Sequence, residues 1–218
     1  MVRGIFIGFV VCALPLAARA ERDPSKACIY GIQGGASRPG GIARAVELVK
    51  DAGFACVRLR ASWPGSEWNH PGPVGADGER QHTYDWSAAN LEEAVNLAHA
   101  AGLKVVVTTQ ATPMWASCRE RDWDKSKCKK WNDYRANNAP RDPKYREDFV
   151  YNMAKHFGDR IEAIEVWNEP NLQGYFSNFG PETYRSKILR PSVRGAKRAR
   201  AEGASHAKIV GGGVFTNE

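Results

Sequence analysis

The residues best suited to chemistry lie in the stretch 165–171, which reads Glu-Val-Trp-Asn-Glu-Pro-Asn. A short alternating apolar segment at 161–164 precedes it and predicts a strand, so Glu169 follows the end of that strand. In a parallel α/β protein, ligands bind at the carboxyl ends of the strands, and a glutamate there can exchange a proton with a bound substrate. The alternative is that Asn168 caps a helix and Pro170 occupies its first turn, which leaves Glu169 as a solvated partner of the helix dipole.

Further candidates for contact with a polar substrate lie near the ends of other predicted strands. Arg58 lies inside the predicted strand 54–60, where a guanidinium is costly unless it reaches water or a carboxylate. Trp63 and Trp115 follow the second and third strands, and an indole in such a loop either stacks on a sugar ring or packs the loop down. Trp167 either forms an apolar wall that raises the pKa of the neighbouring carboxyl or is a packing residue.

Strand patterns alternate with helix patterns along the chain. The predicted strands are 28–32, 54–60, 103–109, 161–164 and 208–215. The predicted helices are 42–51, a segment that opens at 84–87 and ends before Gly102, 141–157, and 181–202 with a break or kink near Pro191. Such alternation indicates a parallel sheet, and the nearly continuous apolar run in the third strand indicates a strand covered on both faces.

Two α/β architectures fit this pattern, an open doubly wound sheet and a (β/α)8 barrel. The open sheet normally carries a cofactor-binding glycine motif after its first strand, and the glycine-rich loop 33–41 contains neither G-x-G-x-x-G nor G-K-[ST]. The long polar loops after the second, third and fourth strands converge on one rim instead, which favours a TIM barrel. A complete barrel needs about 250 residues. We therefore expect this chain of 218 residues to supply about the first five strands, with the remaining strands coming from a longer chain.

The first twenty residues, 1–20, have the pattern of a secretory signal peptide, with Arg3, an apolar run at 5–16 and a cleavage site after Ala20. The apolar run is short for a membrane span, so we expect no stable membrane anchor, although a retained anchor is the alternative. Cleavage leaves 21–218 as the N-terminal portion of one barrel domain in a secreted or periplasmic protein. The net charge falls from +7 to +5 because two arginines leave, and export together with this modest excess argues against a nucleic-acid partner.

Four cysteines follow the predicted cleavage site, and export permits disulfides. Cys118 and Cys128 bracket a polar loop, and we expect them to pair. Cys28 and Cys56 lie at equivalent points of two successive strands, so they either pair or remain buried thiols. The spacing of zinc ligands is absent from the sequence, as are phosphate-binding motifs, so no metal and no cofactor are predicted.

Several motifs together resemble the clan A glycoside hydrolases. The segment 164–171 resembles their fourth-strand motif, and it is most similar to that of family 39, the group of β-xylosidases, iduronidases and bacterial exopolysaccharide glycosidases. Further resemblances are the second-strand arginine motif at 57–59, the aromatic-Asp-Trp opening of the second helix at 84–86, the third-strand exit at 112–116, and the helix leading into the fourth strand at 145–171. The resemblance spans about residues 28 to 215, in the expected order.

The resemblance implies a retaining glycosidase that acts on a β-linked oligo- or polysaccharide. It implies that Glu169 is the general acid/base, that Asn168 bonds the sugar 2-hydroxyl, and that Arg58 lies under the nucleophile and helps to keep it ionised. The nucleophile of the family is a glutamate at the end of the seventh strand, which is missing from this chain, so we expect the chain as given to be inactive. The alternative is a non-catalytic carbohydrate-binding protein on a decayed or incomplete barrel, and both functions would use Trp63, Trp68 and Trp115.

Overall fold

The computed structural model describes residues 28–29, 41–67, 76, 81–117, 137–172, 174–176 and 180–214. The predicted signal peptide and the predicted pair Cys118 and Cys128 lie outside these residues. No helix in the described part of the chain is both long and apolar enough to cross a membrane.

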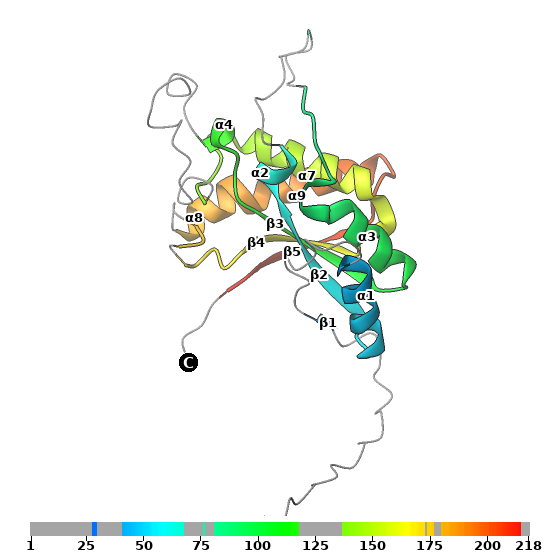
Figure 1. The fold of residues 1–218 in the computed structure, drawn as a ribbon. Coiled ribbons are helices and arrows are strands. Elements are labelled where there is room, and N and C mark those ends of the chain that lie inside the picture. Colours follow the sequence, from blue (N-terminus) through cyan, green and yellow to red (C-terminus); the bar gives the residue numbers. More distant parts are fainter. Residues whose placement is uncertain are drawn as a thin grey trace, which may run out of the picture.

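The centre of the molecule is a parallel sheet whose five strands are neighbours in chain order (Figure 1). The strands are β1 (Cys28–Ile29), β2 (Cys56–Ser62), β3 (Lys104–Gln110), β4 (Ala163–Asn168) and β5 (Lys208–Gly213). In a doubly wound sheet the strand order reverses at its centre, and that reversal is not seen in the order β1-β2-β3-β4-β5. The order is that of a barrel wall built one strand after another, which confirms the predicted α/β fold with about the first five strands of a TIM barrel.

In the described part of the chain, four long helices cover one face of this sheet (Figure 1). They are α1 (Gly41–Asp51), α3 (Leu91–Ala100), α7 (Pro143–Phe157) and α9 (Arg190–Ala201). Right-handed crossovers that always step in the same direction place every connecting helix on the same side. Shorter elements are α2 (Trp63–Ser66), η1 (Ala88–Asn90), α4 (Met114–Ser117), η3 (Gly158–Arg160), α8 (Pro181–Thr183) and the π-helix η4 (Tyr184–Leu189).

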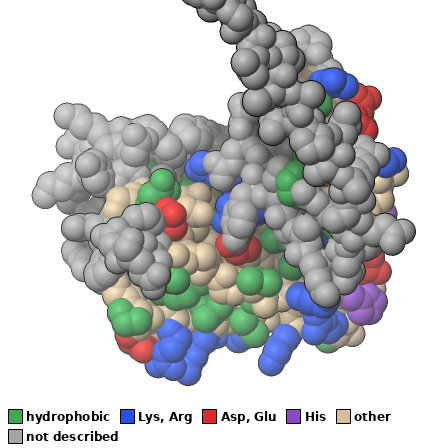
Figure 2. Space-filling model, turned by 90° about the horizontal axis from the view of Figure 1, so that it is seen from below, with side chains coloured by type: hydrophobic (Ala, Val, Ile, Leu, Met, Phe, Trp, Pro, Cys, Tyr) green, Lys and Arg blue, Asp and Glu red, His purple; other side chains and the backbone are tan. Residues whose placement is uncertain are grey.

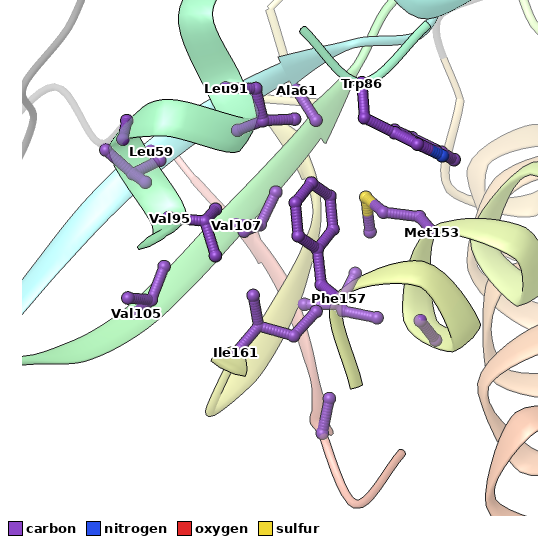
Figure 3. Packing of buried hydrophobic residues seen from close by; sticks show 14 of the residues in the cluster. Leu59, Ala61, Trp86, Leu91, Val95, Val105, Val107, Met153, Phe157 and Ile161 are labelled. Carbon is purple, nitrogen blue, oxygen red and sulfur yellow. The ribbon is translucent and has the colours of Figure 1, made fainter. Parts of the chain in front are cut away.

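Alternation along the strands separates a helix-facing side from an inner side. Val57, Leu59 and Ala61 of β2 are buried in the core between sheet and helices, so Arg58 and Arg60 point to the inner side. Figure 3 shows the core side chains of β2 and β3 meeting those of α3 and α7. A view of the molecule from below shows hydrophobic and basic side chains at the surface of the described part (Figure 2).

Local sequence signals explain where the helices begin and end. The carboxylate of Asp142 accepts a hydrogen bond from the main-chain N of Lys144 at 2.8 Å, and Pro143 occupies the first helical position, so α7 begins two residues after the predicted start at 141. The predicted helix 181–202 consists of α8, the π-helix η4 and α9. The π-helix ends at Leu189, two residues before Pro191, whose ring and missing N–H disfavour regular α-helical bonding to the preceding turn.

The pairing of strands places two cysteines opposite each other. Cys28 and Cys56 are Cα partners in the ladder between β1 and β2. Cys56 is disulfide-bonded, which decides its state between the two alternatives that the sequence left open. The side chain of Cys28 lies outside the described part of the structure.

Candidate active site

The candidate catalytic stretch forms a strained turn at the end of β4. Trp167 and Glu169 have positive φ angles of 75° and 46°, a region that non-glycine residues rarely adopt, least of all bulky ones. The main-chain N of Glu169 donates to the carbonyl of Gly213 at 2.9 Å, which ties the turn to β5. No helix begins at Asn168, so the helix-cap alternative is wrong and the turn instead presents Glu169 at the carboxyl end of the sheet.

A tyrosine anchors the same turn from the helix side. The Tyr184 hydroxyl donates to the carbonyl of Val166 at 2.7 Å and accepts from the main-chain N of Gly212 at 3.0 Å. These bonds tie the carbonyl that precedes the strained Trp167 to η4, and tie the same tyrosine hydroxyl to β5. Strained backbone persists only where its surroundings fix it, and here π-helix and strand fix it together.

The side chains of Arg58, Asn168 and Glu169 form one hydrogen-bonded series. Arg58 Nη2 donates to Asn168 Oδ1 at 2.9 Å, and Asn168 Nδ2 donates to Glu169 Oε2 at 3.2 Å. The three residues come from β2 and from the end of β4, so the sheet brings together the three polar residues that the sequence indicated. All three are partly buried, which leaves Glu169 and Asn168 accessible at the rim.

A second glutamate on β4 takes part in this series. Glu165 Oε2 accepts from Arg58 Nε at 2.5 Å and from Thr108 Oγ1 at 2.6 Å, and Oε1 accepts from the main-chain N of Gly213 at 3.2 Å. Burial raises the pKa of this carboxyl, but the bonds from Arg58, Thr108 and Gly213 outweigh that effect and hold the pKa below its ordinary value. Glu165 is therefore an ionised, buried partner of Arg58.

The tryptophans expected to contact sugar are buried instead. Trp63 stacks on Phe149 with ring centroids 5.1 Å apart, and Trp115 meets Trp63 edge to face at 6.1 Å. Trp167 is fully buried and meets Phe176 edge to face at 5.3 Å. A ring without an exposed face cannot stack on a sugar, so these three indoles pack the loops in the described structure, and their contact with substrate stays a prediction.

A buried polar cluster holds the loops that follow β2 and β3. Trp63 Nε1 donates to Glu67 Oε2 at 2.8 Å, and Trp115 Nε1 lies 3.4 Å from the main-chain carbonyl of Glu67. His82 Nδ1 lies 2.6 Å from Glu67 Oε1, and its Nε2 lies 3.8 Å from Asp148 Oδ2. The cluster satisfies indole N–H groups that would otherwise be orphaned in the core, so it stabilises the rim near the candidate site.

A fully buried arginine lies beneath the strained turn. Arg146 Nη2 donates to Thr109 Oγ1, Arg146 Nε donates to Ser192 Oγ at 3.0 Å, and the guanidinium lies 5.9 Å from the Trp167 ring centroid. Burial lowers the pKa of Arg146 to about 9, so the group is still charged at neutral pH. Thr109 Oγ1 in turn donates to the main-chain carbonyl of Glu165 at 3.1 Å. Arg146 is thus linked to the main chain of β4 through Thr109.

Reasoning from the sequence missed Glu165, Glu67 and Arg146. The signal for Glu165 was present, because a carboxylate inside an apolar strand segment needs a buried cation and Arg58 was the available strand arginine. The signals for Glu67 and Arg146 were weaker, because both lie in polar segments whose burial depends on tertiary contacts. Among the described residues, no cluster of three His, Cys, Asp or Glu side chains could hold a metal ion.

A family model described as Cellulase (glycosyl hydrolase family 5) matches residues 23–217. The chain belongs to this family. Family 5 is a clan A family, so the predicted membership of clan A is confirmed. The sequence motifs indicated family 39 within that clan, whereas the matching model is that of family 5. A comparison with curated proteins gives no significant match.

Solved structures of glycoside hydrolases share this fold. A family 39 glycoside hydrolase from Bacteroides cellulosilyticus WH2 matches with a TM-score of 0.53 at 15% identity, over 87% of this chain and 32% of that one. The GH39 enzyme from Xanthomonas axonopodis pv. citri matches at 0.52 and 20%, over 79% and 31%. A monomeric β-xylosidase from Caulobacter crescentus CB15 matches at 0.51 and 19%, over 84% and 35%. The chain thus spans about a third of the length of these structures.

Proposed function

We propose that this chain is part of an enzyme that hydrolyses O-glycosidic bonds in a β-linked oligo- or polysaccharide by a retaining double displacement. The observation that carries the proposal is the series Arg58–Asn168–Glu169 at the carboxyl end of β4. It places one accessible carboxyl beside one oriented amide on a rigid strand end, where family 5 membership leads us to expect the scissile bond.

Glu169 acts as general acid in the first step and as general base in the second. In the first step its carboxyl gives a proton to the leaving oxygen while a second carboxylate attacks the anomeric carbon. In the second step the Glu169 carboxylate takes a proton from the water that releases the sugar. The second carboxylate should lie about 5–5.5 Å from the first, and we propose that it comes from a strand beyond β5.

Glu165 does not fill the role of nucleophile. Both of its oxygens accept hydrogen bonds, from Arg58, Thr108 and Gly213, and its side chain is only 10% exposed. A nucleophile needs an unshielded oxygen directed at the anomeric carbon. The nucleophile is therefore sought outside the five strands described.

Asn168 is suited to bind a sugar hydroxyl. Because Arg58 donates to Asn168 Oδ1, the amide must be oriented with Oδ1 toward β2 and Nδ2 toward the rim and Glu169. A donor fixed next to the proton donor can hold the 2-hydroxyl of the sugar whose bond is cleaved. We propose that this contact strengthens as the transition state forms.

The rival function is non-catalytic carbohydrate binding on an incomplete barrel. Both functions would use Trp63, Trp68 and Trp115; Trp63 and Trp115 are buried in the core, and Trp68 lies outside the described residues. The site instead supplies a carboxyl, an amide and a guanidinium in direct contact, which supports the enzyme.

The test is the activity of Glu169→Gln in the complete gene product, measured on an aryl β-glycoside and on an unactivated β-linked disaccharide. Glu162→Gln is the matched control, because Glu162 flanks the opposite end of β4 and pairs with Lys208 at 2.6 Å. We expect a loss of about 10²–10⁴-fold on the disaccharide for Glu169→Gln and none for Glu162→Gln. Wild-type rates for Glu169→Gln would refute the proposal.

We also propose that the enzyme is secreted or periplasmic. The support is the signal-like segment 1–20 and its small residues before Glu21. N-terminal sequencing of protein recovered from outside the cytoplasm should begin at Glu21. A protein that retains Met1 would refute the cleavage.

A further inference from the structure

One buried carboxylate joins four neighbouring strands on the inner side of the sheet. Glu165 of β4 accepts bonds from Arg58 of β2, Thr108 of β3 and the main-chain N of Gly213 of β5. Its side chain is 10% exposed and that of Arg58 is 12% exposed. A carboxylate has about four acceptor positions, and three are used here by donors from three different strands.

The same arginine, Arg58, also contacts Asn168 at the carboxyl end of β4. Arg58 Nε lies 2.5 Å from Glu165 Oε2, while its Nη2 lies 2.9 Å from Asn168 Oδ1. The guanidinium is planar and rigid, so a partner that fixes the Nε edge also fixes the direction of the Nη2 donor. Asn168 then has its Nδ2 toward Glu169 Oε2 at 3.2 Å.

We propose that Glu165 is a positioning residue that fixes Arg58 and, through Arg58, sets the orientation of the Asn168 amide beside Glu169. The inference rests on the proposed function, because the value of an oriented amide comes from its contact with the sugar. It assigns a task to a carboxylate that neither gives a proton to the substrate nor attacks it.

The surroundings of Glu165 favour this task over simple packing. A buried carboxylate is costly unless it is ionised beside a cation and hydrogen-bonded, and these three donors hold the pKa of Glu165 below its ordinary value. Thr108 donates to the same oxygen as Arg58, which confines that oxygen to one position between the two strands. An amide in place of the carboxylate would carry no charge and would lose one acceptor.

The decisive experiment is a double-mutant cycle on kcat in the complete enzyme with Glu165→Gln, Asn168→Ala and both changes. We expect Glu165→Gln to lower kcat about tenfold or more with KM within about twofold, because misplacement weakens the transition state more than the ground state. In the Asn168→Ala background the same change should lower kcat by less than about twofold, because the residue it positions is gone. A tenfold loss that persists in that background would overturn the proposal.

A second readout needs no turnover and is made on the complete protein. The side-chain amide resonances of Asn168, assigned by their loss in Asn168→Ala, should shift in Glu165→Gln and stay in place in the matched control Glu162→Gln. Unchanged Asn168 resonances in a folded Glu165→Gln protein would overturn the proposal. If Glu165→Gln does not fold, Thr108→Val is used instead, because it removes one hydrogen-bond donor to the same oxygen of Glu165. Both experiments are then repeated with Thr108→Val, and the same results support or overturn the proposal.

The two proposals fail in different ways. Wild-type activity of Glu169→Gln removes the proposed function, and the Asn168 resonances then still decide whether Glu165 orients the amide. If Glu169→Gln loses activity while the effects of Glu165→Gln and Asn168→Ala on kcat are additive, the proposed function stands and only the positioning role of Glu165 is refuted.

Discussion

Gly212 of β5 offers a direct test of how tightly the strained turn is held. A Cβ at this position would lie 2.7 Å from the carbonyl oxygen of Val166, 2.8 Å from that of Trp167 and 3.2 Å from Pro170 Cδ. Both oxygens belong to the main chain of the turn that presents Glu169, so neither can move aside as a flexible side chain would. Gly212→Ala should therefore push β5 and this turn apart.

The magnitude follows from the size of the overlap. Forcing an extra methyl group into a packed site costs about 1–3 kcal/mol. In a domain of this size each kcal/mol lowers Tm by about 2–4 °C, so we expect a loss of about 2–12 °C. Gly211→Ala is the matched control, because a Cβ at the adjacent Gly211 would meet nothing within 4 Å. Both substitutions reduce the entropy of the unfolded chain by a similar amount, so the difference between the two variants isolates the overlap.

Thermal and urea unfolding of the two variants would measure this difference. We expect Gly211→Ala to be within about 0.5 kcal/mol of the wild type and Gly212→Ala to be less stable. In the complete enzyme Gly212→Ala should also lower kcat, because Glu169 is bonded to β5 through its main-chain N. Equal stability of the two variants would refute the reasoning that β5 packs directly against the turn.

Three further predictions concern packing, pH and disulfides. Gly195→Ala should destabilise the protein by about 1–3 kcal/mol in urea unfolding, because a Cβ there would overlap the carbonyl of Glu147 and lie 2.9 Å from the main-chain N of Tyr151; an unchanged midpoint would contradict the close approach of α7 and α9. Because the pKa of Glu165 is below the ordinary carboxyl value of 4.5, its ionisation stabilises the folded protein fully at pH values above 4.5. This stabilisation is lost as the pH falls through the folded-state pKa. The deficit of Glu165→Gln in unfolding free energy should therefore shrink on acidification below 4.5, and a deficit independent of pH would contradict this. Cys118 and Cys128 should resist thiol labelling in the exported, non-reduced protein, and full labelling of both would end that proposal.

Most of the fold could be predicted because it depends on local patterns. Alternation of strand and helix signals predicted the parallel sheet, and the helix expected at 141–157 is observed as α7 with Asp142 as its cap. The strand ends were less predictable. β4 continues to Asn168 rather than ending at 164, because pairing with β5 extends it through the strained Trp167, and a pairing between distant segments leaves no local signal.

The candidate site was predictable in its polar residues and not in its aromatic ones. Glu169, Asn168 and Arg58 occupy strands whose carboxyl ends must converge, so their proximity followed from topology. Trp63 and Trp115 looked equally suitable for a sugar or for the core, because an indole serves both. Only the tertiary contacts with α7 decide that these rings pack inward.

The central claim is that Glu169 is the general acid/base of a retaining glycosidase, and rescue of Glu169→Gln by azide tests it most directly. The measurement compares the mutant with the wild type in the complete enzyme on an aryl β-glycoside with a good leaving group, with and without azide. We expect the glycosyl-enzyme to form and then persist in the mutant, because no base activates water. Azide, which needs no general base, should restore turnover and yield the β-glycosyl azide. The role of Glu169 would be contradicted if the mutant hydrolysed an unactivated β-linkage at the wild-type rate and if azide did not change its turnover.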